Sequence, residues 1–345
     1  MSLEVYPLGL SIIVGGQFGS EGKGKVSHWY ANKVKASAVI RVGGINSGHT
    51  VVDALGRIHI FRVLPTVAID NNKVCVLPAG SYIDVELLFK EIRQSGINPS
   101  LIRIDPKAAI ITSEHIACEK DSGLSSFIGS TASGTGAAVS MRVNRNTSML
   151  FAKDIPTLAP FICDVTAYLR NELDNGNEIV IEGTQGFGLS NLHTPYYPYA
   201  TSRDTSAAGF LSEVGLSPMD VTNIIMVIRT FPIRVAGNSG PLPYETSWED
   251  ITTISNSAIP LCEYTSVTKK LRRVAHFDPK IVTEAIAVNK PTMIVLNHLD
   301  YIGENGSCSI GSNRRACISK IQSQIGQKID YVGLSNKDIV LCNII

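Results

Sequence analysis

The feature that most constrains the fold is a short apolar run followed at once by a glycine-rich loop. Residues 10–14 read LSIIV, and residues 15–25 read GGQFGSEGKGK. Aliphatic and β-branched residues in a run of this length predict a buried strand, and glycines let backbone N–H groups approach an anion closely. A helix predicted from Val26 adds its positive dipole, and Lys23 adds a point charge. The pattern therefore predicts a unit of strand, phosphate-binding loop and helix.

The loop departs from the Walker pattern at two points. Gly16 lies one residue too far from Gly22 and Lys23, and Gly24 stands where a serine or threonine would hold magnesium. We interpret it as a variant phosphate loop. The alternative, a flexible turn with a solvated lysine, is disfavoured because the glycines and both lysines directly follow a buried strand.

Further apolar runs, with helix-compatible segments between several of them, indicate the fold class. The predicted strands are residues 10–14, 38–42, 74–77, 179–181, 224–228 and 293–296, and the predicted helices are residues 26–34, 85–94, 161–175 and 279–289. Strand and helix in alternation predict an α/β protein like a P-loop NTPase, with a mostly parallel central sheet, helices on both faces and inserted loops. No linker divides the chain, so we expect a single domain over residues 1–345.

Charge and cysteine content exclude some classes of protein. Lys and Arg number 31 against 30 Asp and Glu, so there is no overall attraction to nucleic acid or to an anionic membrane. No apolar stretch approaches the roughly 18 residues that span a bilayer, and no basic leader precedes the first apolar run. Seven scattered cysteines without a CxxC pair suit a reducing compartment. We therefore expect a cytoplasmic protein without nucleic-acid or membrane partners.

Loops rich in Gly, Ser and Thr lie behind or between these elements, where ligands bind in open α/β sheets. They span residues 43–50, 129–136, 183–190 and 201–209. His49, in the sequence GGINSGHT, is placed to donate a proton to a substrate oxygen or to polarise it. Taken alone, such a histidine is more often simply exposed.

The motifs, in this order, resemble those of the adenylosuccinate synthetase family in its compact, archaeal-like form, over nearly the full chain. They are GQFGSEGKGK at 16–25, GGINSGHT at 43–50, IGSTASG at 128–134, EGTQGFG at 182–188, YPYATS at 197–202, FPIRVAG and GPLP within 231–243, and TSVTKKLRR at 265–273 before Phe277 and Asp278. The resemblance implies that a nucleoside triphosphate phosphorylates O6 of a purine monophosphate, and that L-aspartate then displaces the phosphate at C6. It also implies a homodimer in which Arg145 crosses the interface to the monophosphate.

The resemblance assigns roles residue by residue. The catalytic positions are Ser20, Lys23, His49 and Gln185. The triphosphate-binding positions are Gly19, Glu21, Gly22, Gly24, Lys25, Gly48, Thr50, Asn297, Asp300 and Gly333. The monophosphate-binding positions are Ser20, Asn46, Ser130, Thr131, Arg145, Gln185, Thr201 and Val235, and those for aspartate are Thr265, Val267, Thr268, Lys270 and Arg272. Mg²⁺, the implied cofactor, would be held at Ser20 and Gly48. For the KKLRR segment the alternative is a solvated basic face.

One departure changes the expected substrate. The family's loop reads GDEGKGK, and its Asp takes the N1 proton of IMP and ligates magnesium, whereas this chain has Ser20. A serine hydroxyl is not a competent base near neutral pH without an activator. Either the protein binds nucleotides without turnover, or its substrate has changed. Serine opens space beside C2 and can accept a hydrogen bond from the 2-amino group of guanine.

The chain is similar to a bacteriophage branch of the family, the 2-aminoadenylosuccinate synthases, which use dGMP to begin making 2-aminoadenine for phage DNA. It shares GSxGKG, VTKKxRR and Thr201-Ser-Arg-Asp204 with that branch. Lys270 replaces the arginine that reaches the ribose hydroxyl in the parent family. The hypothesis is ligation of L-aspartate to dGMP, giving N6-succino-2-amino-2′-deoxyadenylate, in host cytoplasm if the gene is phage-borne.

Three points stay open at this stage. Asp300 favours GTP as donor because it can pair with guanine N1 and N2 hydrogens, whereas the resemblance and the amide of Asn297 favour ATP or dATP. The group that takes the N1 proton is Glu21, a magnesium-bound hydroxide or phosphate. The other functions considered are an ordinary adenylosuccinate synthetase acting on IMP with GTP and a non-catalytic nucleotide-binding homologue.

Overall fold

A large sheet forms the centre of the computed structural model, which describes residues 9–265, 269–303 and 310–343. In the described part of the chain this sheet has nine strands in the order β16-β15-β14-β10-β1-β9-β2-β5-β7, and all neighbours are parallel except β15 and β16. Its strands are β1 (Leu10–Gly15), β2 (Ala38–Arg41), β5 (Val74–Leu77), β7 (Ile102–Ile104), β9 (Ile179–Glu182), β10 (Val221–Arg229), β14 (Met293–Asn297), β15 (Tyr331–Gly333) and β16 (Ile339–Leu341). The mostly parallel sheet confirms the predicted fold class.

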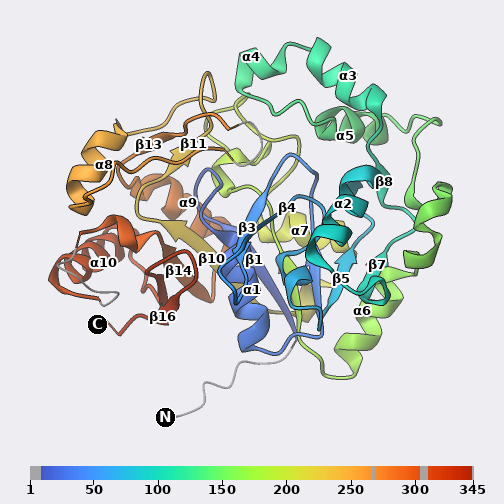
Figure 1. Ribbon diagram of the computed structural model, residues 1–345, viewed down its shortest axis with the longest axis horizontal. Coiled ribbons are helices and arrows are strands. Elements are labelled where there is room, and N and C mark those ends of the chain that lie inside the picture. The colour runs from blue at the N-terminus through green and yellow to red at the C-terminus, as the bar shows by residue number, and fades with distance from the viewer. Residues whose placement is uncertain (1–8, 266–268, 304–309, 344–345) are drawn as a thin grey trace.

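Helices cover both faces of this sheet (Figure 1). They are α1 (Lys23–Lys33), α2 (Val85–Ser95), α3 (Ser113–Asp121), α4 (Leu124–Ile128), α5 (Thr135–Val143), α6 (Val165–Asp174), α7 (Ala207–Val214), α8 (Trp248–Ser255), α9 (Pro279–Asn289) and α10 (Ser312–Ile325). Along β1, Ile12 and Val14 belong to the core on the face covered by α6, α7, α9 and α10, whereas Ile13 belongs to the core on the face covered by α1 and α2. Buried apolar side chains on both faces explain why the strand sequences are continuously apolar. None of the described helices is long and apolar enough to cross a membrane.

Smaller sheets flank the large one. They are β3 (His49–Val52) with β4 (Ile58–Phe61), β6 (Tyr82–Ile83) with β8 (Ala109–Ile110), and β11 (Ile233–Arg234) and β12 (Glu245–Thr246) with β13 (Arg273–Ala275). In Figure 1, α3, α4 and α5 group at the top, and α8 lies beside β11 and β13 at the upper left. These additions are the inserted segments expected around the central sheet.

Two predicted helices begin elsewhere than expected. The first helix starts at Lys23 and not at Val26, because Gly22, with φ 89°, ends the left-handed loop immediately before it. The helix expected over 161–175 starts at Val165, where the Asp164 side chain caps it by accepting the N–H of Ala167 at 3.0 Å. The remaining predicted elements agree with the structure to within a few residues.

Candidate active site

The candidate site lies at the carboxyl edge of the large sheet, where β1, β2, β9, β10 and β14 all end. A cavity of about 550 Å³ opens there, and a neighbouring one of about 440 Å³ shares part of its wall. Because parallel strands end at the same edge, loops far apart in sequence meet around these cavities. The shared wall consists of Phe18, Asn46, Gly129, Ser130, Thr131, Gln185, Leu189, Arg234 and Val235.

The phosphate loop contributes one side of the larger cavity. Gly19, Ser20 and Gly22 have φ angles of 87°, 58° and 89°, so the chain turns sharply between β1 and α1. Of these three residues only Ser20 is not a glycine, so its left-handed backbone conformation is the unfavourable one. Its carbonyl oxygen accepts a 3.0 Å hydrogen bond from Arg229 Nη1. Ser20 is exposed on the cavity wall, and Lys23 lines the cavity beside it.

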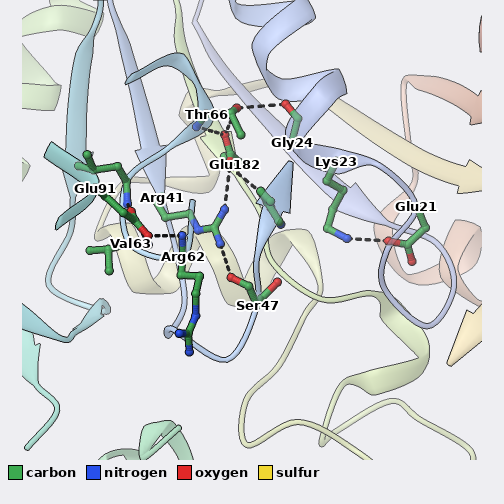
Figure 2. Close-up of polar contacts among 12 residues, drawn as sticks. Glu21, Lys23, Gly24, Arg41, Ser47, Arg62, Val63, Thr66, Glu91 and Glu182 are labelled. Carbon is green, nitrogen blue, oxygen red and sulfur yellow. Dashed lines mark hydrogen bonds and ion pairs between the residues drawn. The ribbon is translucent and has the colours of Figure 1, made fainter. Parts of the chain in front are cut away.

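Glu21 turns into the loop and away from the cavity. Its Oε1 accepts the backbone N–H groups of Gln17 and Gly19 at 3.1 and 2.8 Å, and its Oε2 lies 2.6 Å from Lys23 Nζ (Figure 2). The Glu21 side chain is 0% exposed. The structure therefore does not bring this predicted triphosphate ligand to the cavity wall, and a proton acceptor for the substrate is not found at its carboxylate.

His49 is held by a buried carboxylate that the sequence analysis passed over. Glu182 Oε1 lies 2.7 Å from His49 Nδ1 and accepts Arg41 Nη1 at 2.8 Å, and its Oε2 accepts the N–H and hydroxyl of Thr66. Figure 2 shows Glu182 between Arg41 and Thr66. Glu182 is the first residue of the motif EGTQGFG. The one sequence signal that could have identified it is its charge, because it stands at the end of a predicted buried strand.

Electrostatics define the protonation of this pair. Burial alone would raise the pKa of Glu182, but the hydrogen bond and charge of His49 and the charge of Arg41 lower it to about 2. Burial and the charge of Arg41 lower the pKa of His49 to about 4. An ionised carboxylate only accepts, so Nδ1 of the neutral imidazole carries the hydrogen. Nε2 is then an acceptor, and proton donation by His49 requires anionic phosphates in the cavity to raise its pKa.

The smaller cavity brings together most of the predicted monophosphate ligands. Asn46, Ser130, Thr131, Gln185, Thr201 and Val235 line it. The amide of Asn46 donates to Thr201 Oγ1 at 3.3 Å, which joins loop 43–50 to loop 201–206. The backbone N–H groups at the N-terminus of α5 already have an acceptor, because the carboxylate of Glu119 accepts hydrogen bonds from Gly134, Gly136 and Ala137. The hydroxyls of Ser130 and Thr131, more than the helix N-terminus, are therefore the groups presented to a phosphate.

Arg145 lies elsewhere. It is exposed, has a φ of 54°, and lines neither cavity of its own chain. A contact between Arg145 and the monophosphate thus requires another copy of the chain, and it stays a prediction.

Residues of the 265–273 segment also line the larger cavity. Thr265, Lys270 and Arg272 line it, whereas the predicted ligands Val267 and Thr268 lie outside the described residues. Arg272 Nη1 bonds Glu263 Oε2 at 2.9 Å, and its side chain is only 16% exposed, so it does not belong to a solvated basic face.

Glu263 is a second acidic residue that the sequence analysis missed. Arg229 and Arg272 both form ion pairs with its carboxylate, and the Tyr301 hydroxyl donates to it at 2.8 Å. Burial by itself would raise the pKa of Glu263, but the charge of Arg229 holds it well below its usual range. Since Arg229 also bonds the carbonyl of Ser20, this cluster connects the 265–273 segment to the phosphate loop.

The residues predicted to read the donor base lie together, outside the wall of either cavity. Asn297 is buried and donates to the carbonyl of Glu21 at 2.8 Å, and Lys25 Nζ donates to the carbonyl of Ser335 at 2.9 Å. A Cβ on Gly333 would lie 2.1 Å from Asn297 Oδ1 and 2.5 Å from Lys25 Nζ, so only glycine fits there. Burial lowers the pKa of Lys25 to about 8, although nearby Asp300 opposes the shift. His298, which was not predicted, lines the larger cavity instead.

The remaining predicted triphosphate ligands, Gly19, Gly22, Gly24, Gly48 and Thr50, all line the larger cavity. Within the described ranges, no group of three or more His, Cys, Asp or Glu side chains is placed to hold a metal. Mg²⁺ commonly uses one or two protein oxygens together with substrate phosphates. The Ser20 hydroxyl and the Gly48 carbonyl on this wall therefore fit a magnesium ion that arrives with a nucleotide, better than a resident ion.

The fold and the cavity define a nucleotide-binding α/β enzyme with a variant phosphate loop. Comparison with known proteins gives the family: the adenylosuccinate synthetase family model matches residues 12–151 and 149–313. The enzyme of Methanocaldococcus jannaschii is 39% identical over 86% of this chain and 84% of its own length. That of Methanococcus aeolicus is 35% identical over 93% of this chain and 95% of its own. The chain belongs to the adenylosuccinate synthetase family and is therefore a carbon–nitrogen ligase of purine biosynthesis.

Solved structures agree with this assignment. Succinoaminodeoxyadenylate synthetase of cyanophage S-2L, bound to dGMP and to dATP as an energy donor, superposes with a TM-score of 0.82. It is 28% identical, and the match covers 97% of this chain and 95% of the phage enzyme. Fully ligated adenylosuccinate synthetase from Plasmodium falciparum superposes with a TM-score of 0.83 over 96% of this chain and 99% of its own, at 20% identity, which supports the fold alone.

Proposed function

We propose that the protein joins L-aspartate to C6 of dGMP at the expense of ATP or dATP, forming N6-succino-2-amino-2′-deoxyadenylate for 2-aminoadenine DNA. The observation that carries this proposal is Ser20. Its side chain is exposed on the cavity wall at the position where the parent family has the carboxylate that takes the N1 proton of IMP. A hydroxyl is shorter than a carboxylate, so it leaves room for a 2-amino group and can accept its hydrogen bond.

Residues on the cavity wall would carry out two steps. In the first, O6 of the purine attacks the γ-phosphorus, the nucleoside diphosphate leaves, and the N1 proton passes to a phosphate oxygen or to hydroxide. Lys23, the imidazole of His49 and the amide of Gln185 would stabilise the charge that develops on O6 and on the transferred phosphoryl group. Ser20 and Gly48 would hold magnesium, which neutralises phosphate charge when bound.

In the second step the amine of aspartate attacks C6, and phosphate leaves with the oxygen. Arg272 would hold an aspartate carboxylate, because among the described residues Glu263 accepts only from its Nη1, which leaves other guanidinium N–H groups for a charge-assisted pair. Lys270 lies on the same wall. Glu263, which lines the same cavity, would orient Arg272 through their ion pair.

The donor is proposed to be ATP or dATP, following the phage enzyme bound to dGMP and dATP. GTP stays the alternative, because Asp300 lies near Lys25 at the ends of β14 and β15. Direct comparison of ATP, dATP and GTP in the assay below decides between them.

A second candidate function is ordinary adenylosuccinate synthesis from IMP and GTP. The archaeal relatives favour it, since they are 39% and 35% identical to this chain and carry that name. A non-catalytic homologue is the third candidate. It would bind purine nucleotides but release no phosphate when aspartate is added.

The test is a competition between dGMP and IMP at equal concentrations, with aspartate, Mg²⁺ and each donor, followed by mass analysis of the succino-product. We expect product from dGMP in excess over product from IMP. Product from IMP alone would overturn the assignment of dGMP, and no product from either would favour the non-catalytic homologue.

The proposed enzyme acts in the cytoplasm as a homodimer. Arg145 is exposed and away from its own cavities, which suits a role at the site of a second copy. Light scattering tests the dimer. In the R145L variant we expect the KM for the monophosphate to rise while the mass in solution stays that of a dimer.

A further inference from the structure

A partly buried ion pair, Arg203 with Glu213, lies behind the two loops that meet at the smaller cavity. Arg203 follows Thr201 by two residues, and Glu213 is on α7, away from both cavity walls. The two side chains are 11% and 17% exposed, and Arg203 Nη2 lies 3.1 Å from Glu213 Oε1. No role in the proposed reaction requires either residue.

The pair reaches loop 43–50 through Gly43. A Cβ on Gly43 would lie 2.8 Å from Arg203 Nη2, and the residue has a φ of 104°, so glycine is required for this close approach. The N–H of Gly43 also interacts with the carboxylate of Glu213. Across the cavity side, Asn46 of the same loop donates to Thr201. The two loops are thus connected at two places. Asn46 and Thr201 connect them at the cavity wall, and Gly43, Arg203 and Glu213 connect them on the side away from the cavity.

The Arg203–Glu213 pair leaves two buried polar atoms without hydrogen bonds among the described residues. Glu213 Oε2 and Arg203 Nη1 are both buried, and neither has a hydrogen-bond partner among the described residues. Arg203 lies over the ring of Tyr82, its guanidinium carbon 5.8 Å from the ring centroid, and Arg142 lies over the same ring at 6.0 Å. A carboxylate with one unpaired buried oxygen accepts a proton there without losing a hydrogen bond.

The charges around Glu213 place its titration near neutrality. Burial raises its pKa to about 7, and the charge of Arg203, the N–H of Gly43 and the charge of Arg142 oppose the rise, whereas Asp204 adds to it. Tyr82, the other ionisable group beside this pair, also has a raised pKa through burial and is neutral in this range. Glu213 is therefore the group of this cluster that changes charge between pH 6 and pH 8.

We propose that Arg203 and Glu213 are positioning residues that hold loops 43–50 and 201–206 together around the monophosphate, and that protonation of Glu213 loosens this connection and weakens monophosphate binding. The ionised pair attracts across 3.1 Å, and protonation of Glu213 removes that attraction because the neutral carboxyl group carries no charge to face the guanidinium. The inference rests on the proposed function in one respect: it assumes that a purine monophosphate binds beside Asn46 and Thr201.

The first test needs no substrate. Hydrogen–deuterium exchange of the free protein is measured at pH 6 and pH 8 and corrected for the intrinsic exchange rate. We expect loops 43–50 and 201–206 to exchange about fivefold faster at pH 6 than at pH 8 in the wild type, which is the size of effect expected when a partly exposed ion pair is lost. In E213Q both loops should exchange at the faster rate at both pH values.

The matched control is D220N, which breaks the Arg170–Asp220 ion pair, whose contact distance is 2.6 Å and whose residues line neither cavity. D220N should keep the wild-type pH dependence in both loops. R203M is the second variant, so that the test stands if E213Q does not fold, and it should behave as E213Q does. Exchange that is independent of pH in the wild type, or loss of the pH dependence in D220N as in E213Q, would overturn the proposal.

The second test separates this inference from the proposed function. With whichever monophosphate the wild type turns over, the ratio of KM in E213Q to KM in the wild type should be about fivefold at pH 8 and near one at pH 6, with kcat little changed. Taking the ratio cancels the titration of the substrate's own phosphate. A constant ratio refutes the inference while leaving the reaction intact, whereas a wild type without turnover refutes the proposed function and leaves the exchange test to decide the connection.

Discussion

Replacing Glu182 by glutamine removes the charge that holds three elements together behind the cavity. The carboxylate accepts from Arg41, from His49 and twice from Thr66, and it is 0% exposed. An amide cannot accept all four, and Arg41 is left as an uncompensated charge whose side chain is only 3% exposed. Breaking a buried ion pair from one side costs about 3–5 kcal/mol, so we expect E182Q to lose about that much free energy of unfolding at pH 7.

The pH dependence of this loss follows from the pKa of Glu182. The folded protein lowers that pKa from 4.5 to about 2, so the stabilisation is fully present above pH 4.5 and is lost as the pH falls from there toward 2. The assay is urea unfolding of the wild type and E182Q at pH 7, 5.5 and 3.5. The difference between the two proteins should be equal at the two higher pH values and smaller at pH 3.5.

The control is D220N, which breaks the Arg170–Asp220 pair, where Arg170 is 41% exposed. Pairs of that kind contribute about 0–1 kcal/mol. An E182Q loss no larger than that of D220N, or a difference that grows below pH 4.5, would refute the reasoning. Activity gives a further readout, because His49 loses the partner that orients its ring, and we expect kcat to fall by roughly 10²-fold or more.

Three other predictions concern the substrates. S20D should lower the kcat/KM of dGMP at least tenfold by crowding the 2-amino group, and should raise that of IMP, as measured in the same competition assay; an unchanged preference would exclude Ser20 as the determinant. R272L should raise the KM for aspartate about 10- to 100-fold, from the loss of charged hydrogen bonds, with the KM for the monophosphate little changed; equal effects on both would place Arg272 elsewhere in the mechanism. Chelation of Mg²⁺ should abolish turnover, and added Mg²⁺ should restore it, without a change in thermal stability of the nucleotide-free protein, because no described cluster of ligands holds a resident ion.

Local sequence predicted the framework well. The runs at 10–14, 74–77 and 293–296 became strands of the large sheet, and the glycine loop after the first of them turned as expected into α1. These elements were predictable because burial on both faces of a parallel sheet demands continuous apolar runs, and because a left-handed turn demands glycine. The bounds were less predictable, as Lys23 shows, since a helix begins where the preceding backbone leaves the left-handed region.

The sequence by itself also determined which chemical groups the site contains: the phosphate loop with Ser20, the histidine of GGINSGHT, and the basic segment that ends in Arg272. Only the tertiary structure decided how those groups are paired. In the structure Glu21 forms an ion pair with Lys23, Glu182 contacts Nδ1 of His49, and Glu263 forms ion pairs with both Arg229 and Arg272. The pairs of Glu182 with His49 and of Glu263 with Arg229 join residues from different loops or strands, whose meeting depends on the order of strands in the sheet, whereas Glu21 with Lys23 and Glu263 with Arg272 pair within one segment. A linear pattern does not contain that order, and burial of the pairs then sets the pKa values on which the chemistry depends.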